Sequence, residues 1–444
     1  MLSNNMFTYY LRLAAISLKR NRILTALMIA AIALGIGMSM TSMTVLHMMG
    51  SNPMSYKDEQ VRRVQLDNWD VNEPWDEDYP TEPPELMTYQ DANNLVQAHK
   101  AEHEAAFFPN VLPLEPEKRE IKPYMVEALF TTAGFFPIFE PPFRYGTGWT
   151  PAEDRSAARV AVIDAETNDK LFGGENSVGR KVRLGGEDFT VVGVLEKWRP
   201  TPRVYHVSNG AFNDPQSVFV PFSFGIEKKL NSNSNNSCYK DSEPGYEGLL
   251  ASDCIWIDMW VQVKDEADAQ RYLSFLNDYV GEQKKAGRFP RPVNNRVYTV
   301  SEFLQAQRVV GRDVRTQVWL AFAFFAVCLI NTVGLLLAKF MGKAPEIGLR
   351  RAVGASKPAV FAQYLTESGL VGIAGGLLGL VLTGLGLLAL RKLYAGTSIE
   401  RLAELDWVMV GLSLLIALVA SLIAGLYPTW RACQVQPATQ LKTQ

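Results

Sequence analysis

The chain has 444 residues, more than one ordinary domain needs, and a formal net charge of −2. This near-neutral balance gives no reason to expect a nucleic-acid partner. Its hydrophobic residues make up 48% of the composition, but they are concentrated at the start and in the last third. A polar stretch rich in Pro, Asp and Glu lies between. The composition therefore predicts a membrane protein with a large water-exposed domain.

Four apolar runs, at residues 23–46, 318–337, 369–390 and 407–427, contain no Asp, Glu, Lys or Arg. Each has about the 20 residues that a helix needs to cross a bilayer. We expect four transmembrane helices, at 23–47, 316–340, 362–391 and 407–430.

The first run could also be a cleaved signal peptide, because basic residues precede it. However, it is longer than the usual apolar core of roughly 7–15 residues, and no convincing A-x-A cleavage site follows. An uncleaved membrane anchor is the preferred interpretation.

Lys and Arg residues gather before the first run, between the second and third, and after the fourth. Such segments remain in the cytoplasm. The predicted cytoplasmic parts are therefore an N-terminal segment (1–22), a loop (341–361) and a tail (431–444). A large domain (48–315) and a short outer loop (392–406) lie on the other side.

The large domain is predicted to have an α+β fold. Residues 89–103 and 267–280 have helical patterns, and a last helix from about residue 301 is expected to continue into the membrane. The β-branched runs RVAVID, FTVVGVL and SVFVP indicate strands. The predicted fold class is an α-helical membrane protein with four transmembrane helices and a large α+β extracytoplasmic domain.

Two cysteines lie in the predicted outer domain, one of them within a polar, turn-rich loop at residues 231–248. Because that compartment is oxidising, Cys238 and Cys254 are candidates for a disulfide. Two free thiols are the alternative. Cys328 and Cys433 are expected to be inert packing residues.

The inner loop GKAPEIGLRRAVGASKPAVFAQYLTESG carries the most informative signals. Pro345 and Glu346 suit the first turn of a helix, and Gly354 suits its end. Ser356 can cap a second helix. The result is a short, basic, amphipathic helix between two spans. Such a helix could dock into a groove on a partner or lie on anionic lipid, and the residues alone leave both open.

Two short motifs are reminiscent of enzymes. His99 and His103 form H-x-x-E-H with Glu102, a zinc-protease pattern, but no third ligand is evident, and a solvated helix end is preferred. Residues 174–182 approach a phosphate-binding loop, yet Arg180 stands where its Lys is required. No catalytic and no metal-binding residue is therefore predicted.

Small residues at four-residue spacing allow helices to approach closely in lipid. They lie in two predicted helices: Ala31, Gly35 and Ser39 in the first, and Gly372, Gly375, Gly376 and Gly379 in the third. Packing within one subunit and a subunit interface remain alternatives for the first helix. Asn331 in the second helix is expected to hydrogen-bond between helices.

The stretches PEIGLRRAVGAS and QYLTESGLVGIAGGLLGLVLTG resemble the hallmark of FtsX-like ABC transporter permeases of the MacB type. LRLAAISLKRNRILTALMIAAIALGIG is similar to the first helix of this family. RVAVIDAETNDKLFGGENSVGRKVRLGGEDFTVVGVLEK is similar to its outer domain, and YPTWRACQVQPATQLK to its closing segment. Together these stretches cover most of the chain in the family's order.

The resemblance implies a dimer of two copies, or of two related permeases, in a bacterial inner membrane. The inner loop would supply a coupling helix that contacts a separate cytoplasmic ATPase, which binds ATP and Mg; this chain itself would hold no cofactor. Membrane lipid and a periplasmic adaptor are further candidate partners. The outer domain would have two lobes, one inserted at about 157–225. The implied coupling residues are Glu346, Ile347, Gly348, Arg350, Arg351, Gly354 and Ala355.

Three functions agree with this resemblance. The first is MacB-type export. The second is extraction of lipoproteins of the Lol type. The third is a non-transporting FtsX-like regulator of an extracytoplasmic enzyme. The large outer domain favours the first two, and the wording EIGLRRAVGA is closer to the MacB type.

Overall fold

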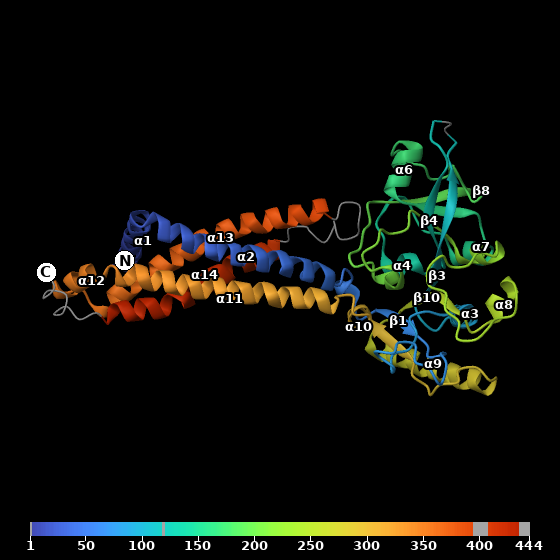
Figure 1. The fold of residues 1–444 in the computed structure, drawn as a ribbon. Helices are drawn as coiled ribbons and strands as arrows, with labels where there is room; N and C mark the ends of the chain where they lie inside the picture. Colours follow the sequence, from blue (N-terminus) through green and yellow to red (C-terminus); the bar gives the residue numbers. More distant parts are fainter. Residues whose placement is uncertain (1, 118–119, 394–406, 435–444) are drawn as a thin grey trace. The chain divides into compact units, whose positions relative to one another are not determined.

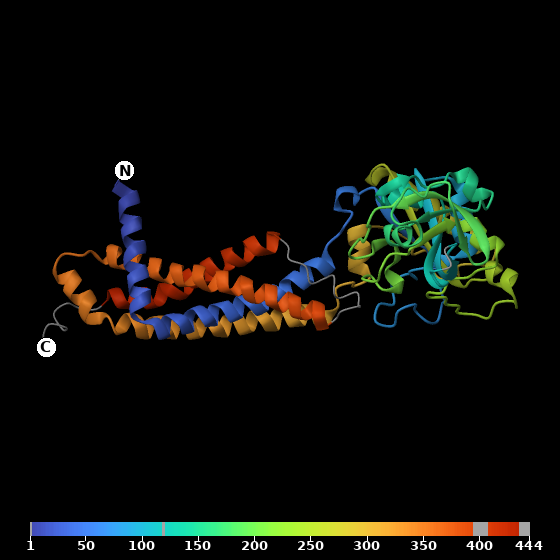
Figure 2. The same cartoon turned by 90° about the horizontal axis from the view of Figure 1, so that it is seen from above.

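The computed structural model describes residues 2–117, 120–393 and 407–434. The chain divides into two compact units, which are described separately (Figures 1 and 2). The membrane unit comprises Met1–Met49 and Val310–Gln444, and the outer unit comprises Gly50–Val309. The predicted outer loop lies almost wholly outside the described residues, as does the last part of the predicted tail.

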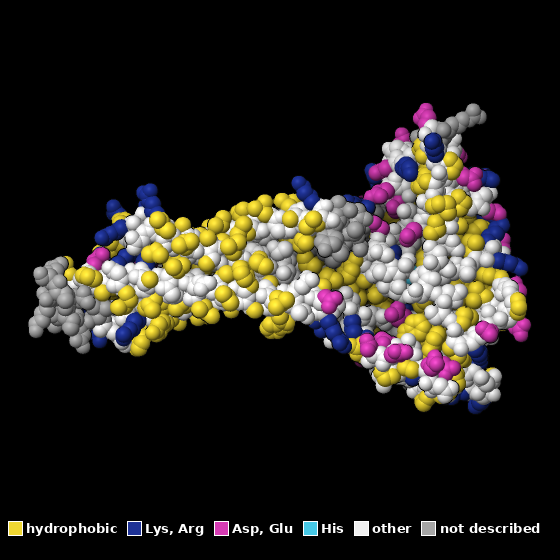
Figure 3. All heavy atoms as spheres, in the orientation of Figure 1, with side chains coloured by type: hydrophobic (Ala, Val, Ile, Leu, Met, Phe, Trp, Pro, Cys, Tyr) yellow, Lys and Arg dark blue, Asp and Glu magenta, His cyan; other side chains and the backbone are white. Residues whose placement is uncertain are grey.

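Within the described part of the membrane unit, four helices are long and apolar enough to cross a membrane. They are α2 (Arg22–Gly50), α11 (Arg312–Met341), α13 (Lys357–Leu393) and α14 (Trp407–Cys433). Apolar side chains cover most of this unit on the face seen in Figure 3. Two shorter helices, α1 (Leu2–Arg20) and α12 (Ala344–Ala352), complete the unit.

Helix α1 was not among the predicted elements, because residues 1–22 read only as a basic segment. It is a helix of 19 residues that ends just before Asn21, and α2 begins just after it. Figure 2 shows α1 running across the end of the helical bundle rather than along it. α1 packs against α13.

The glycines of α13 allow it to pack closely against two helices. A Cβ atom at Gly375 or Gly379 would lie 2.7 or 2.8 Å from Ile32 or Ile36 of α2. On the adjacent face, a Cβ at Gly376 would lie 2.7 Å from the Cβ of Ala417 in α14. Gly372 likewise faces Ser421 of α14. These four glycines therefore serve packing within the subunit.

The small residues of α2 also pack within the subunit. Gly35 lies against Phe325 of α11, and the Ser39 hydroxyl donates to the carbonyl of Ala321 at 3.0 Å. Ala31 is half-buried. Asn331 is exposed on α11 in the single chain. Of the two alternatives for the first helix, packing within the subunit accounts for Gly35 and Ser39.

The outer unit is built on one continuous sheet of eleven strands in the order β11-β1-β10-β3-β4-β9-β6-β8-β5, with β2 beside β10 and β7 joining β3 to β8. Neighbouring strands are antiparallel except for β4–β9 and β6–β8. The strands are β1 (Val61–Gln65), β2 (Met87–Thr88), β3 (His103–Glu115), β4 (Tyr124–Thr131), β5 (Phe143–Gly146), β6 (Val160–Ile163), β7 (Lys181–Leu184), β8 (Glu187–Leu195), β9 (Val218–Pro221), β10 (Ile255–Gln262) and β11 (Arg296–Thr299).

Eight α-helices accompany this sheet among the described residues of the outer unit. They are α3 (Tyr89–Ala98), α4 (Phe135–Phe139), α5 (Pro151–Arg155), α6 (Ala165–Phe172), α7 (Phe222–Glu227), α8 (Tyr246–Ala251), α9 (Glu266–Lys285) and α10 (Val300–Ala306). Strand β3 connects different parts of the sheet, because it pairs with β10 at its start and with β4 and β7 farther along.

The predicted helix at 89–103 is too long. His99 adopts a left-handed conformation with φ of 47°, which ends α3 at Ala98, and β3 begins at His103. His99 and His103 therefore do not share a helix face, and the helical basis for the H-x-x-E-H motif is wrong.

The prediction that the helix from residue 301 continues into the membrane is also wrong. A capping box of Thr299 and Glu302 starts α10, which ends at Ala306. Arg308 has a φ of 48°, a conformation that a helix cannot contain, and α11 begins only at Arg312.

A buried ionic network joins β1 to β10. Arg63 forms an ion pair with Asp258 at 2.7 Å, and the other carboxylate oxygen lies 2.7 Å from Nδ1 of His206. All three side chains are almost completely buried. Burial alone would raise the pKa of Asp258, but the charges of Arg63 and His206 outweigh it and hold that pKa below its ordinary value.

Asp258→Asn should lower the free energy of unfolding of the outer unit by about 3–5 kcal/mol, because it leaves the Arg63 charge buried without a counter-charge. Glu282→Gln is the matched control. It removes an exposed pair with Lys285 and should cost less than about 1 kcal/mol. Urea unfolding of residues 50–309 measures both.

The same network predicts a pH dependence. A carboxylate whose pKa is depressed by folding stabilises the fold above its unfolded pKa of about 4, and this contribution is lost as the pH falls through the folded value. The wild-type unit should therefore lose more stability below about pH 4 than Asp258→Asn does. Parallel acid-unfolding profiles would contradict the assignment.

The close packing of α13 can be tested with one pair of alanine substitutions. Gly379→Ala should destabilise the protein by about 1–3 kcal/mol, because the new Cβ meets Ile36. In Gly384→Ala the new Cβ has no neighbouring atom within 4 Å, so we expect no loss. Thermal unfolding of the detergent-purified chain compares the two; equal midpoints would disprove the packing.

Candidate coupling site

The coupling hairpin, residues 341–361, connects α11 to α13 through the short helix α12. Pro345 lies in the first turn of α12, and Gly354, with φ of 108°, follows its end. The amide of Ala355 then donates to the carbonyl of Arg350 at 3.0 Å. Left-handed geometry at Gly354 turns the chain back, as expected for a glycine just after a helix.

The second helix of the hairpin differs from the prediction. The hydroxyl of Ser356 accepts a hydrogen bond from the amide of Ala359 at 3.4 Å, so it caps a helix as predicted. That helix is not separate, however. It is the beginning of α13, which continues without interruption from Lys357 to Leu393, because its one proline, Pro358, lies in the first turn, where a helix tolerates it.

One face of α12 is buried against the bundle. Ala344, Ile347 and Gly348 are buried, and Ile347 belongs to the same apolar cluster as Phe340 and Tyr364. α12 also packs against α14. Ile347 and Gly348, two of the predicted coupling residues, therefore seat the helix.

The charged residues of α12 bind within the chain. The guanidinium of Arg350 contacts Glu346 at 2.7 Å and donates to the side-chain oxygen of Gln363 at 3.1 Å. Arg351 donates to the carbonyl of Cys433 at 3.1 Å. Glu346 also pairs with Arg20 at 3.7 Å. These contacts fix α12 to α1, α13 and the end of α14.

Two exposed apolar side chains, one on the outward face of α12 and one directly after its last residue, were not among the predicted coupling residues. Leu349 is 59% exposed and Val353 is 82% exposed. Val353 directly follows Ala352, and its spacing of four residues from Leu349 places both side chains on the side away from Ile347. Their spacing of four residues was the signal in the sequence that could have identified this apolar side. The coupling role was instead predicted for the charged residues next to them.

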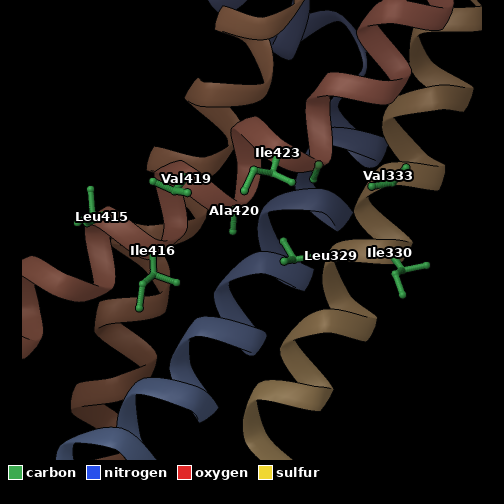
Figure 4. Close-up of a pocket in the computed structure, with 9 residues that line it drawn as sticks. Leu329, Ile330, Val333, Leu415, Ile416, Val419, Ala420 and Ile423 are labelled. Atoms are coloured by element: carbon green, nitrogen blue, oxygen red, sulfur yellow. The ribbon is translucent and has the colours of Figure 1, made fainter.

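An apolar groove lies between α11 and α14 (Figure 4). Its volume is about 510 Å³. Aliphatic side chains line it: Leu329, Ile330, Val333, Leu415, Ile416, Val419, Ala420, Ile423 and Ala424. Such a lining suits an acyl chain or another apolar helix.

The outer unit contains a cavity of about 520 Å³ that His99, Glu102, His103 and Glu104 help to line. Nδ1 of His99 lies 3.9 Å from the carboxylate of Glu104. Within the described ranges, no three His, Cys, Asp or Glu side chains are placed to hold a metal ion.

The four cysteines divide as their surroundings suggest. Cys238 and Cys254 are joined by a disulfide. Cys328 and Cys433 are free and buried. The bond closes the polar loop onto β10, next to the bridge between Ser237 and Ile255.

Two family profiles match the chain. The MacB-like periplasmic core domain matches residues 25–274, and the FtsX-like permease C-terminal domain matches residues 318–437. The first alone covers more than half of the chain. The chain belongs to the MacB-like family of FtsX-like ABC transporter permeases. This MacB-like permease is an inner-membrane protein whose large domain lies in the periplasm.

Curated relatives extend well beyond this chain. The macrolide export ATP-binding/permease protein MacB of Bdellovibrio bacteriovorus is 25% identical over 67% of this chain and 41% of its own length. The pyoverdine export ATP-binding/permease protein PvdT of Pseudomonas entomophila is 26% identical over 57% and 35%. The chain thus spans less than half the length of these relatives. The periplasmic region of MacB from Actinobacillus actinomycetemcomitans is 13% identical, with a TM-score of 0.36, over 57% of this chain and 94% of that structure.

Proposed function

We propose that this MacB-like permease is the membrane subunit of an exporter driven by a separate cytoplasmic ATPase. In this proposal, the ATPase binds ATP and Mg, and the coupling hairpin receives its movement. The membrane unit then passes the movement to the periplasmic domain. A second permease, identical or related, completes the assembly.

The observation that carries this proposal is that one side of α12 is bound within the chain, whereas the opposite side is apolar and exposed. Its inner face is fixed by Ile347, Arg350 and Arg351, so the helix cannot turn without breaking several contacts. Its outer face presents Leu349, and Val353 follows directly after its last residue; both side chains are exposed. A firmly seated helix with apolar side chains at one side suits insertion into a groove on another protein.

The continuity of α13 supports transmission of movement. The helix starts within the hairpin at Lys357 and runs through the third span to Leu393. An α-helix rises about 1.5 Å per residue and is stiff along its axis, so displacement at one end is carried to the other.

Export is favoured over the two alternatives because the matched relatives are named as macrolide and pyoverdine exporters. Extraction of lipoproteins and regulation of a wall enzyme would use the same coupling. These three functions differ in the periplasmic partner, which would be an adaptor, a lipoprotein or a wall hydrolase.

The test is purification of the tagged full chain from its native membranes, with mass spectrometry of bound proteins and assay of ATP hydrolysis. We expect a protein with a phosphate-binding loop to co-purify. The double variant Leu349→Asp, Val353→Asp should reduce its recovery at least about tenfold, since charge prevents burial of this apolar face.

Met125→Asp is the matched control, because Met125 is 60% exposed on the outer unit; this variant should retain the ATPase.

Charge reversal at Arg350 and Arg351 should abolish stimulation of ATP hydrolysis, because it breaks the contacts that hold α12 in place. Absence of any ATPase from the wild-type preparation would contradict the proposal, as would equal recovery with the aspartate variant.

A further inference from the structure

A fully buried carboxylate lies next to the coupling hairpin. Glu367 of α13 has no exposed surface. One of its oxygens accepts a hydrogen bond from the Ser17 hydroxyl at 2.6 Å and lies 2.7 Å from Nζ of Lys339. The other lies 3.6 Å from Nζ of Lys343. None of the predicted coupling residues belongs to this group.

The side chains around Glu367 come from separate parts of the membrane unit. Ser17 is on α1, Lys339 is near the end of α11, and Lys343 immediately precedes α12. Lys343 also donates to Ser17. Lys339 donates to the hydroxyl of Thr25 on α2 at 3.2 Å. We call these five residues the Glu367 network. It connects α1, α2, α11, α13 and the start of the hairpin.

A fully buried side chain keeps its charge only where opposite charges and hydrogen bonds surround it, because removing a charge from water costs free energy. Attraction between charges also falls more steeply with distance in an interior of low dielectric constant than in water. The network therefore resists separation of its members. Lys343 is adjacent to the first residue of α12, so any shift of α12 acts directly on the pairing with Glu367.

We propose that Glu367 is a positioning residue for coupling: its network clamps α1 and the entry of α12 to α11 and α13, so that movement of the hairpin displaces these helices together. Without the clamp, the turn at Gly342 and Lys343 would absorb the movement. This inference rests on the proposed function.

The first test does not need the ATPase. Ala14 of α1 is completely buried, and α1 packs against α13. We would place a cysteine there with Ala14→Cys, in a background in which Cys328 and Cys433 are replaced by alanine. Glu367→Gln should speed maleimide labelling of this cysteine by about tenfold, because a neutral amide holds Lys343 and the Ser17 hydroxyl less firmly than the carboxylate does, so α1 separates from α13 more often.

Thr366→Val is the matched control, because the Thr366 hydroxyl donates to the carbonyl of Ala362 within α13 itself. It should label at the wild-type rate. Glu367→Asp keeps the charge and provides a second variant should Glu367→Gln not yield a monodisperse protein. It should label at an intermediate rate.

The second test measures coupling in the purified complex with the ATPase. Glu367→Gln should retain the bound ATPase but reduce the kcat of ATP hydrolysis by about three- to thirtyfold, with the KM for ATP unchanged. The double variant Glu367→Lys, Lys339→Glu should have a higher kcat than Glu367→Lys alone, because it rebuilds the ion pair with the two charges exchanged. A merely structural role would lower recovery of the complex instead.

The outcomes separate the two proposals. If no ATPase binds the wild-type chain, the proposed function fails, while accelerated labelling would still establish the clamp on α1. If the wild-type complex hydrolyses ATP and Glu367→Gln matches it in turnover or in labelling, the positioning role is overturned and the proposed function stands.

Discussion

The close approach of α13 to its neighbours is the constraint on which the membrane unit depends. In lipid, helices gain no hydrophobic free energy by associating, so close packing and polar contacts must hold them together. Gly375 and Gly379 allow α2 to approach one face of α13, and Gly372 and Gly376 allow α14 to approach the other. A helix held from two sides cannot slide alone. Any force on the end of α13 that follows α12 is therefore shared by three helices.

The Glu367 network completes this packing where the glycines end. Ser368, next to Glu367, packs against Gly425 of α14, so this level of α13 is also closely surrounded. Close packing excludes water. Without water, an unpaired charge costs much free energy, and the attraction between paired charges is stronger. Lys339 and Lys343 supply the pairing. Tight packing and the buried ions thus reinforce each other, and together they position the hairpin.

Signals that act over a few residues could be predicted from the sequence. Long uncharged runs gave the four spans, and Pro345 and Gly354 marked the ends of α12 because helix termini have local chemistry. Long-range and conformational features could not be predicted. Nothing local shows that Ser17 meets Glu367, 350 residues away, or that His99 turns left-handed to end α3. The four-residue spacing of Leu349 and Val353 places them together, but only the burial of Ile347 shows that their side faces outward.

The division of roles within α12 follows from the directionality of its contacts. Arg350 and Arg351 make hydrogen bonds, which depend on angle and so fix the rotation of the helix. Leu349 and Val353 offer apolar surface, which binds without strict direction and tolerates small changes in a partner's groove. A partner that holds the apolar side therefore loads the directional bonds on the opposite side. Since those bonds end on α13 and α14, the load passes directly into the spans rather than into the turn at Gly342 and Lys343.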